Sequence, residues 1–184
     1  MNASASRIAR TLFLAALASA VAVGCSKKVK ETPPTDTPVD TGATTQPVTE
    51  TPRAGAYTPA DLDTDACLRN RVVFFDLDQD ALKPEFQAAM SCHAKYLRDR
   101  PSARLRLEGN ADERGSREYN LSLGQKRADA VRKSMQLLGV KEEQIESVSL
   151  GKEKPAVEGH DESAWSKNRR AHILYKGPTG TGEF

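Results

Sequence analysis

The stretch GNADERGSREYNLSLGQKRADAV, residues 109–131, joins a charged turn to the beginning of an amphipathic helix. Small and apolar residues recur at three- and four-residue spacing, at Leu121, Gly124, Ala128, Val131, Met135 and Leu138. Such a stripe covers one face of a helix and has to pack against a core. Gly139 follows the stripe and is placed to end the helix. The charged turn in front of it is either an ordinary solvated surface or one wall of a pocket.

Outside this stretch, the pattern predicts strands and helices in alternation. Residues 103–108 alternate between apolar and charged side chains, which is typical of a half-exposed strand. The other predicted elements are a short turn of helix at 58–62, a buried strand at 71–76, a helix from 84 to 100, strands at 145–150 and 172–176, and a shorter helix at 162–170. The order β-α-β-α-β-(α)-β predicts an α/β (α+β) two-layer domain over residues 57–176, with helices on one face of the sheet. Residues 177–184 are expected to be a flexible tail.

The N-terminus is typical of an export signal. Arg7 and Arg10 precede an apolar run at 11–23 that is too short to span a bilayer. The run ends in AVGCS, residues 22–26, which resembles a bacterial lipobox although leucine is more usual where Ala22 stands. Residues 1–24 are therefore predicted to be a lipoprotein signal peptide, with Cys25 lipidated and anchored in a membrane by its acyl chains. The alternative is a plain cleavage site.

Residues 25–56 are rich in threonine and proline and have almost no large apolar side chain. Such a segment buries too little surface to offset its ordering entropy, so it is predicted to be a disordered tether. It would reach ~120 Å when fully stretched, and would span ~35 Å on average as a flexible coil.

The charge balance argues against a nucleic-acid partner. The chain has 27 basic and 25 acidic residues, and the loss of Arg7 and Arg10 with the signal peptide leaves 25 of each. Binding to nucleic acid depends mainly on phosphate neutralisation, for which a neutral protein has no general electrostatic basis.

Cys67 and Cys92 remain as an even pair if Cys25 is acylated. An exported protein meets an oxidising compartment, so these two residues are candidates for a disulfide worth roughly 3 kcal/mol. The alternative is two separate buried thiols. Cys92 and His93 do not form a nucleophile and its base, because adjacent helical residues do not face each other.

The residues of the charged turn suit a zwitterionic ligand. Asn120 and Arg127 are seven apart and share one helix face, while Asp112 lies on the loop that leads into the helix. Arg127 offers a fork for a carboxylate, and Asp112 an acceptor for an ammonium group. The alternative is a salt bridge between Asp112 and Arg127, with Asn120 merely capping the helix.

Several segments carry a resemblance to a known family. They are NADERG at 110–115, YNLSLG at 119–124, RADAV at 127–131, GKEKPA at 151–156, GHDE at 159–162 and SKNRRA at 166–171. These resemble the OmpA-like peptidoglycan-binding domains, and the lipobox and tether place the chain near the lipid-anchored members of that family. The resemblance implies a mixed sheet and a non-enzymatic adaptor without a cofactor, anchored in the outer membrane and facing the periplasm.

In the family, residues that match Asp112 and Arg127 grip the meso-diaminopimelate of the peptidoglycan stem peptide, and Asn120 matches a supporting position. The resemblance also implies a Tol partner, TolB, and a role in envelope integrity and cell division. The alternative is a family member that binds peptidoglycan without a Tol partner. A cell-wall hydrolase is not expected, because neither a zinc triad nor an activated nucleophile is visible.

A second stretch, FFDLDQDALKPEF at 74–86, alternates three aspartates like an EF-hand loop. Ala81 and Gln87 stand where calcium binding needs glycine and glutamate, so no metal site is expected. Asp78 matches an acid of the family's ligand loop, whereas Leu77 replaces its usual aromatic residue and Ala81 its usual acid.

Other polar and aromatic residues give weaker signals. His93, His160 and His172 are scattered without metal-ligand spacing, and Asp161 is expected to cap the helix that follows it. We expect a core position for Trp165, with stacking on a ligand as the alternative. For Asn168, Arg169 and Arg170 we expect structural or partner contacts, with a position beside the pocket as the alternative.

Overall fold

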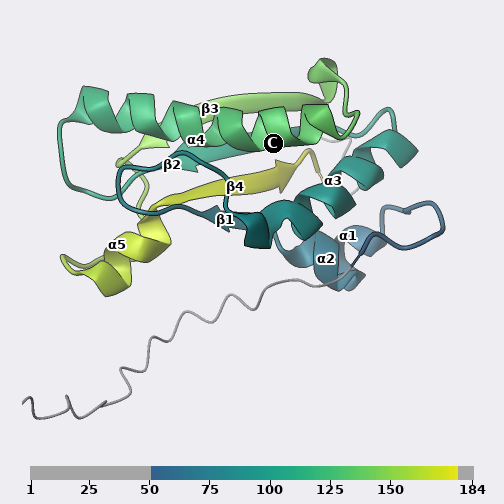
Figure 1. The fold of residues 1–184 in the computed structure, drawn as a ribbon, viewed down its shortest axis with the longest axis horizontal. Coiled ribbons are helices and arrows are strands. Elements are labelled where there is room, and N and C mark those ends of the chain that lie inside the picture. The colour runs from purple at the N-terminus through teal and green to yellow at the C-terminus, as the bar shows by residue number, and fades with distance from the viewer. Residues whose placement is uncertain (1–50, 178–184) are drawn as a thin grey trace, which may run out of the picture. The chain divides into compact units, whose positions relative to one another are not determined.

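The computed structural model describes residues 51–177 (Figure 1). The predicted signal peptide (1–24), the lipidation site Cys25, most of the predicted tether and the predicted tail after 177 lie outside the described residues. The elements in order are α1 (Asp61–Thr64), α2 (Ala66–Arg69), β1 (Val72–Phe74), η1 (Pro84–Phe86), α3 (Gln87–Asp99), β2 (Leu105–Asn110), α4 (Arg117–Leu137), η2 (Glu142–Gln144), β3 (Ile145–Gly151), α5 (Glu162–Asn168) and β4 (Arg170–Tyr175). The predicted order of strands and helices is confirmed.

The four strands form one mixed sheet in the order β1-β4-β2-β3. β4 is antiparallel to both of its neighbours, and β2 and β3 are parallel, with Leu107 opposite Ile173 on one side and Ser147 on the other. The C-terminal ends of β1, β2 and β3 therefore all lie at the same end of the sheet as the N-terminal end of β4. The predicted buried strand at 71–76 is wrong in detail, since β1 has three residues, is half-buried and lies at the sheet edge.

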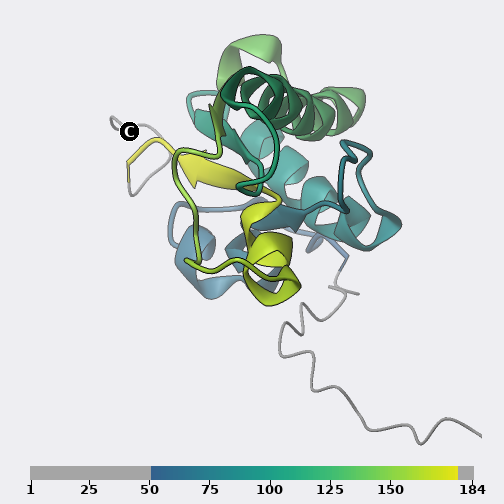
Figure 2. The same cartoon turned by 90° about the vertical axis from the view of Figure 1, so that its left-hand side faces the viewer.

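Helices α3 and α4 cover one face of the sheet, as predicted (Figures 1 and 2). The core between them and the sheet includes Leu105 and Leu107 from β2, Val131 and Met135 from α4, and Leu97 from α3. α4 begins at Arg117 because the Ser116 side chain accepts a hydrogen bond from the backbone N–H of Tyr119. Gly139 follows the last turn with a φ of +89°, a conformation that favours glycine.

Two glycines bring α4 directly against the sheet. A Cβ atom at Gly109 of β2 would lie 1.8 Å from the carbonyl oxygen of Gly124 in α4. A Cβ atom at Gly124 would lie 2.4 Å from the Ser149 side chain and 2.7 Å from the Gly109 carbonyl oxygen. No larger residue fits at either position without displacing backbone, so the pair sets the distance between helix and strand.

Cys67 of α2 and Cys92 of α3 form a disulfide, as predicted, with their Cα atoms 6.1 Å apart. It joins the small helices to α3 at the end of the sheet opposite α5 (Figure 1). None of the helices between residues 51 and 177 has both the length and the apolar character that a membrane span requires.

Candidate ligand-binding pocket

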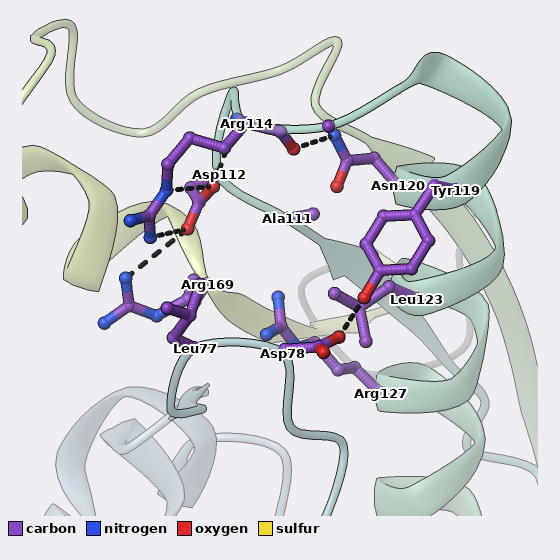
Figure 3. A pocket seen from close by; sticks show the side chains of 11 residues that line it. Leu77, Asp78, Ala111, Asp112, Arg114, Tyr119, Asn120, Leu123, Arg127 and Arg169 are labelled. Carbon is purple, nitrogen blue, oxygen red and sulfur yellow. Dashed lines mark hydrogen bonds and ion pairs between the residues drawn. The ribbon is translucent and has the colours of Figure 1, made fainter.

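A cavity of about 290 Å³ lies where β1 and β2 end and β4 begins, beside the first turns of α4 (Figure 3). Its lining residues come from the loops after β1 and β2, from α4 and from the α5–β4 junction. They are Leu77, Asp78, Ala111, Asp112, Arg114, Gly115, Tyr119, Asn120, Leu123, Arg127 and Arg169. The structure thus brings together the four predicted site residues, Asp78, Asp112, Asn120 and Arg127.

Arg127 is fully buried and lines the cavity. Its Nε donates to the carbonyl oxygen of Gln79 (2.9 Å), Nη1 to that of Asn110 (2.8 Å) and Nη2 to that of Asp76 (3.1 Å). These bonds fasten the loop after β1 to the end of β2. Burial first, and then the charge of Arg169, lower the pKa of Arg127 from 12.5 to about 10, so it stays charged at neutral pH.

Asp112 does not pair with Arg127, so the alternative of a salt bridge between these two residues is wrong. Its carboxylate accepts from the backbone N–H of Arg114 (3.1 Å) and from the Arg114 guanidinium (3.1 and 2.7 Å), and it lies 3.4 Å from Arg169 Nη1. Burial would raise the pKa of Asp112, but the hydrogen bonds and charge of these arginines lower it overall. Asp112 is therefore a buried carboxylate that remains ionised.

Asn120 stabilises the turn that carries Asp112 and Arg114. It is buried, and its Nδ2 donates to the carbonyl oxygen of Arg114 at 2.7 Å. The alternative role of helix cap is wrong, because Ser116 caps α4 four residues earlier. Lys152 fastens the same turn from the other side by donating to the carbonyl oxygens of Glu113 (3.1 Å) and Gly115 (2.7 Å).

Asp78 lies at the mouth of the cavity, opposite these residues. It is exposed, has a φ of +56° and accepts a hydrogen bond from the Tyr119 hydroxyl. This bond joins the loop after β1 to α4 (Figure 3). Leu77 and Tyr119 are 56% and 47% exposed and provide apolar surface on either side of the mouth.

Arg169 lines the pocket, which was the less favoured alternative for this residue. It was expected to make structural or partner contacts, but its buried guanidinium lines the cavity, donates through Nε to the Phe75 carbonyl oxygen (3.1 Å) and pairs with Asp112 and Glu162. No spacing rule links Arg169 to Asp112, which are 57 residues apart. Asn168 and Arg170 lie outside the cavity; Asn168 holds the backbone of residues 156–157, and Arg170 donates to the carbonyl oxygen of Lys154.

Trp165 is not a core residue, contrary to the prediction. It is half-buried, its Nε1 donates to Glu113 at 2.9 Å, and the Arg114 guanidinium lies 4.0 Å from the centroid of its ring. The ring therefore supports the outer side of the charged turn. Asp161 caps α5 as predicted, accepting from the backbone N–H of Ala164.

The charges that line the cavity are three guanidinium groups and two carboxylates, those of Asp78 and Asp112. A cation and an anion on facing walls suit a ligand that carries both signs, and the surplus positive charge favours a carboxylate. Residues 51–177 hold no cluster of three or more His, Cys, Asp or Glu side chains that could bind a metal ion.

The fold and this site place the chain among known proteins. The model of the OmpA family matches residues 74–169, and the chain belongs to that family. The peptidoglycan-associated lipoprotein of Haemophilus influenzae is 46% identical over 121 residues, which cover 66% of this chain and 76% of that protein. The protein of the same description from Pseudomonas putida is 43% identical over 162 residues, which cover 86% of this chain and 92% of the relative.

Solved structures agree with these relatives. The crystal structure of the peptidoglycan-associated lipoprotein from Burkholderia pseudomallei matches with a TM-score of 0.61 and 49% identity, covering 63% of this chain and 98% of that chain. The resemblance to OmpA-like domains, and to the lipid-anchored members among them, is therefore confirmed.

Proposed function

We propose that this protein is a non-enzymatic adaptor that binds the diaminopimelate-containing stem peptide of peptidoglycan in the cavity between Arg127 and Asp112. The observation that carries the proposal is the burial of the Arg127 charge without a carboxylate partner. It is a fully buried cation at the wall of a cavity, and no carboxylate among the described residues pairs with it.

Arg127 keeps donors for a ligand after its contacts with the protein are made. A guanidinium has five N–H donors, and three of them go to the carbonyl oxygens of Asp76, Gln79 and Asn110. A buried charge is costly without a counter-ion, so a ligand carboxylate at this wall would relieve that cost. These three carbonyl oxygens hold the Arg127 guanidinium in place beforehand, which lowers the entropic cost of binding.

The opposite wall suits the ammonium half of the same zwitterion. Asp112 is buried and ionised, and Asn120 and Lys152 fix the turn that carries it. Meso-diaminopimelate ends in a carboxylate and an ammonium group on one carbon, so it carries both of the charges that Arg127 and Asp112 would complement. The names of the relatives, which associate those proteins with peptidoglycan, point in the same direction.

The cellular role follows from the predicted anchor. Acyl chains on Cys25 would hold the protein in the outer membrane, and residues 25–56 would let the domain reach the cell wall in the periplasm. We propose TolB as a partner and a part in envelope integrity and cell division. The second candidate, a peptidoglycan-binding lipoprotein without a Tol partner, is separated from the first by pull-down of TolB from envelope extracts with the full chain.

Co-sedimentation with purified diaminopimelate-type sacculi tests the proposed site. We expect the wild-type chain to pellet, and Arg127→Ala and Asp112→Ala to remain in the supernatant. Arg132→Ala is the matched control, because Arg132 lies on α4 but pairs with Asp129 outside the cavity. Circular dichroism melts would show which variants remain folded. Pelleting of folded Arg127→Ala and Asp112→Ala at the wild-type level would refute the site, and a wild type that stays in solution would refute the function.

A further inference from the structure

The two arginines that contact Asp112 differ in how firmly they are held. Arg169 is only 6% exposed, and its guanidinium is fixed by the Phe75 carbonyl oxygen at the end of β1 and by Glu162 at the start of α5. It reaches Asp112 at 3.4 Å. The Arg169 guanidinium is therefore held firmly in the lining of the cavity.

Arg114 makes the shorter contacts with Asp112, at 2.7 and 3.1 Å, yet its side chain is 36% exposed. It also has partners on the outer side of the turn. Its guanidinium stacks on Trp165 at 4.0 Å from the ring centroid, and its Nη2 lies 4.0 Å from Glu162 Oε2. A small movement outward would keep both of these partners and release Asp112.

We propose that Arg114 stands in for the cation of the ligand: its guanidinium neutralises Asp112 in the free protein, and the ligand's ammonium group takes its place. This inference rests on the proposed function. It makes Arg114 a specificity-determining residue, since a ligand without a cation leaves the ion pair between Arg114 and Asp112 intact.

The surroundings of Asp112 allow such an exchange. Oδ1 keeps the hydrogen bond from the backbone N–H of Arg114 at 3.1 Å, whichever cation is bound. Arg169 stays in place on the α5–β4 side and keeps the buried carboxylate ionised during the exchange. Trp165 gives the displaced guanidinium a surface on which to stack, and cation–π contacts of this kind are favourable even when partly solvated.

Isothermal titration of the full chain with a disaccharide-tripeptide that carries free diaminopimelate tests the exchange. Arg114→Gln removes the competing charge, so we expect it to bind roughly fivefold more tightly than the wild type, the scale of a partly exposed ion pair. Arg114→Lys keeps a charge without the planar fork, and its affinity should lie between the two. Arg132→Gln, outside the cavity, should bind like the wild type.

The same disaccharide-tripeptide with its diaminopimelate amine acetylated is the second probe. It brings no cation, so its affinity for Arg114→Gln should show no comparable gain over the wild type. Weaker binding of the free-amine probe by folded Arg114→Gln would overturn the inference and make Arg114 a ligand contact. A wild type that does not bind the free-amine probe would instead refute the proposed function itself.

Discussion

At the scale of single residues, Arg127 has a structural role beside the role in recognition that we propose for it. Its three hydrogen bonds to backbone carbonyls join the loop after β1 to the last residue of β2, two segments that are far apart in the sequence. The same charge lies at the wall of the cavity with no carboxylate partner in residues 51–177. A lysine at this position would keep the charge but could not reach three acceptors in a plane.

His93 gives a prediction about pH. It is fully buried; its Nε2 donates to the Asn70 carbonyl oxygen (3.0 Å), and the Tyr175 hydroxyl donates to its Nδ1 (2.8 Å). Burial lowers the pKa of His93 from 6.5 to about 4. The unfolded chain therefore binds a proton more readily than the folded one, and His93 should cost up to about 3 kcal/mol of stability as the pH falls from 6.5 to 4.

Urea unfolding of the wild type and of His93→Gln between pH 8 and pH 4 would measure this effect. The decline below pH 6.5 should be smaller in His93→Gln. His160→Gln should make it larger, because the hydrogen bond and charge of Glu113 raise the pKa of exposed His160. Half-buried His172, whose pKa is also lowered by burial, contributes equally to both proteins and cancels in the comparison. Parallel curves for wild type and His93→Gln would contradict the assignment.

At the scale of elements, the contact between α4 and β2 depends on glycine. Gly124→Ala adds a methyl group 2.4 Å from Ser149 Oγ and 2.7 Å from the Gly109 carbonyl oxygen. Alanine favours a helix by about 1 kcal/mol, but displacing packed backbone costs about 1–3 kcal/mol, so we expect a net loss of stability and weaker ligand binding. Gly55→Ala, with no atom within 4 Å of the added Cβ, is the matched control in urea unfolding. An unchanged urea midpoint for Gly124→Ala would show that α4 can move away from β2 to make room for the methyl group at no cost in stability.

Sequence periodicity predicted most of these elements because each has its own repeating contrast between apolar and polar residues. The stripe of α4 and the alternation of β2 are local patterns, and both are confirmed. Arg169 was assigned to other contacts because it meets Asp112 only when β4 inserts between β1 and β2. The predicted core position of Trp165 was wrong for a related reason. A large aromatic side chain suggests a core, but its partners, Glu113 and Arg114, lie on a loop that is distant in the sequence.

At the scale of the whole molecule, the disulfide secures the N-terminal helices to the sheet domain. It closes a loop of 25 residues and joins α2 to α3. Cys67→Ser with Cys92→Ser should lower the free energy of unfolding by about 2–4 kcal/mol. Ligand affinity should stay unchanged, because neither cysteine, and no residue of α2 or α3, lines the cavity. Thermal melts with and without reductant, followed by titration, would check both parts, and equal melting temperatures would contradict the first.

The cavity and the beginning of the folded domain also lie at opposite ends of the strands. Tyr57 packs on Tyr96 near the end of α3, and its backbone N–H donates to Asp99, whereas the cavity lies at the edge where β4 begins. A pull applied between Tyr57 and a ligand held by Arg127 would run along the strands. It would load the hydrogen bonds on either side of β4 in shear, all together, rather than peel them apart one after another. With the proposed anchor on one side and the proposed ligand on the other, the strands would carry the load between membrane and cell wall.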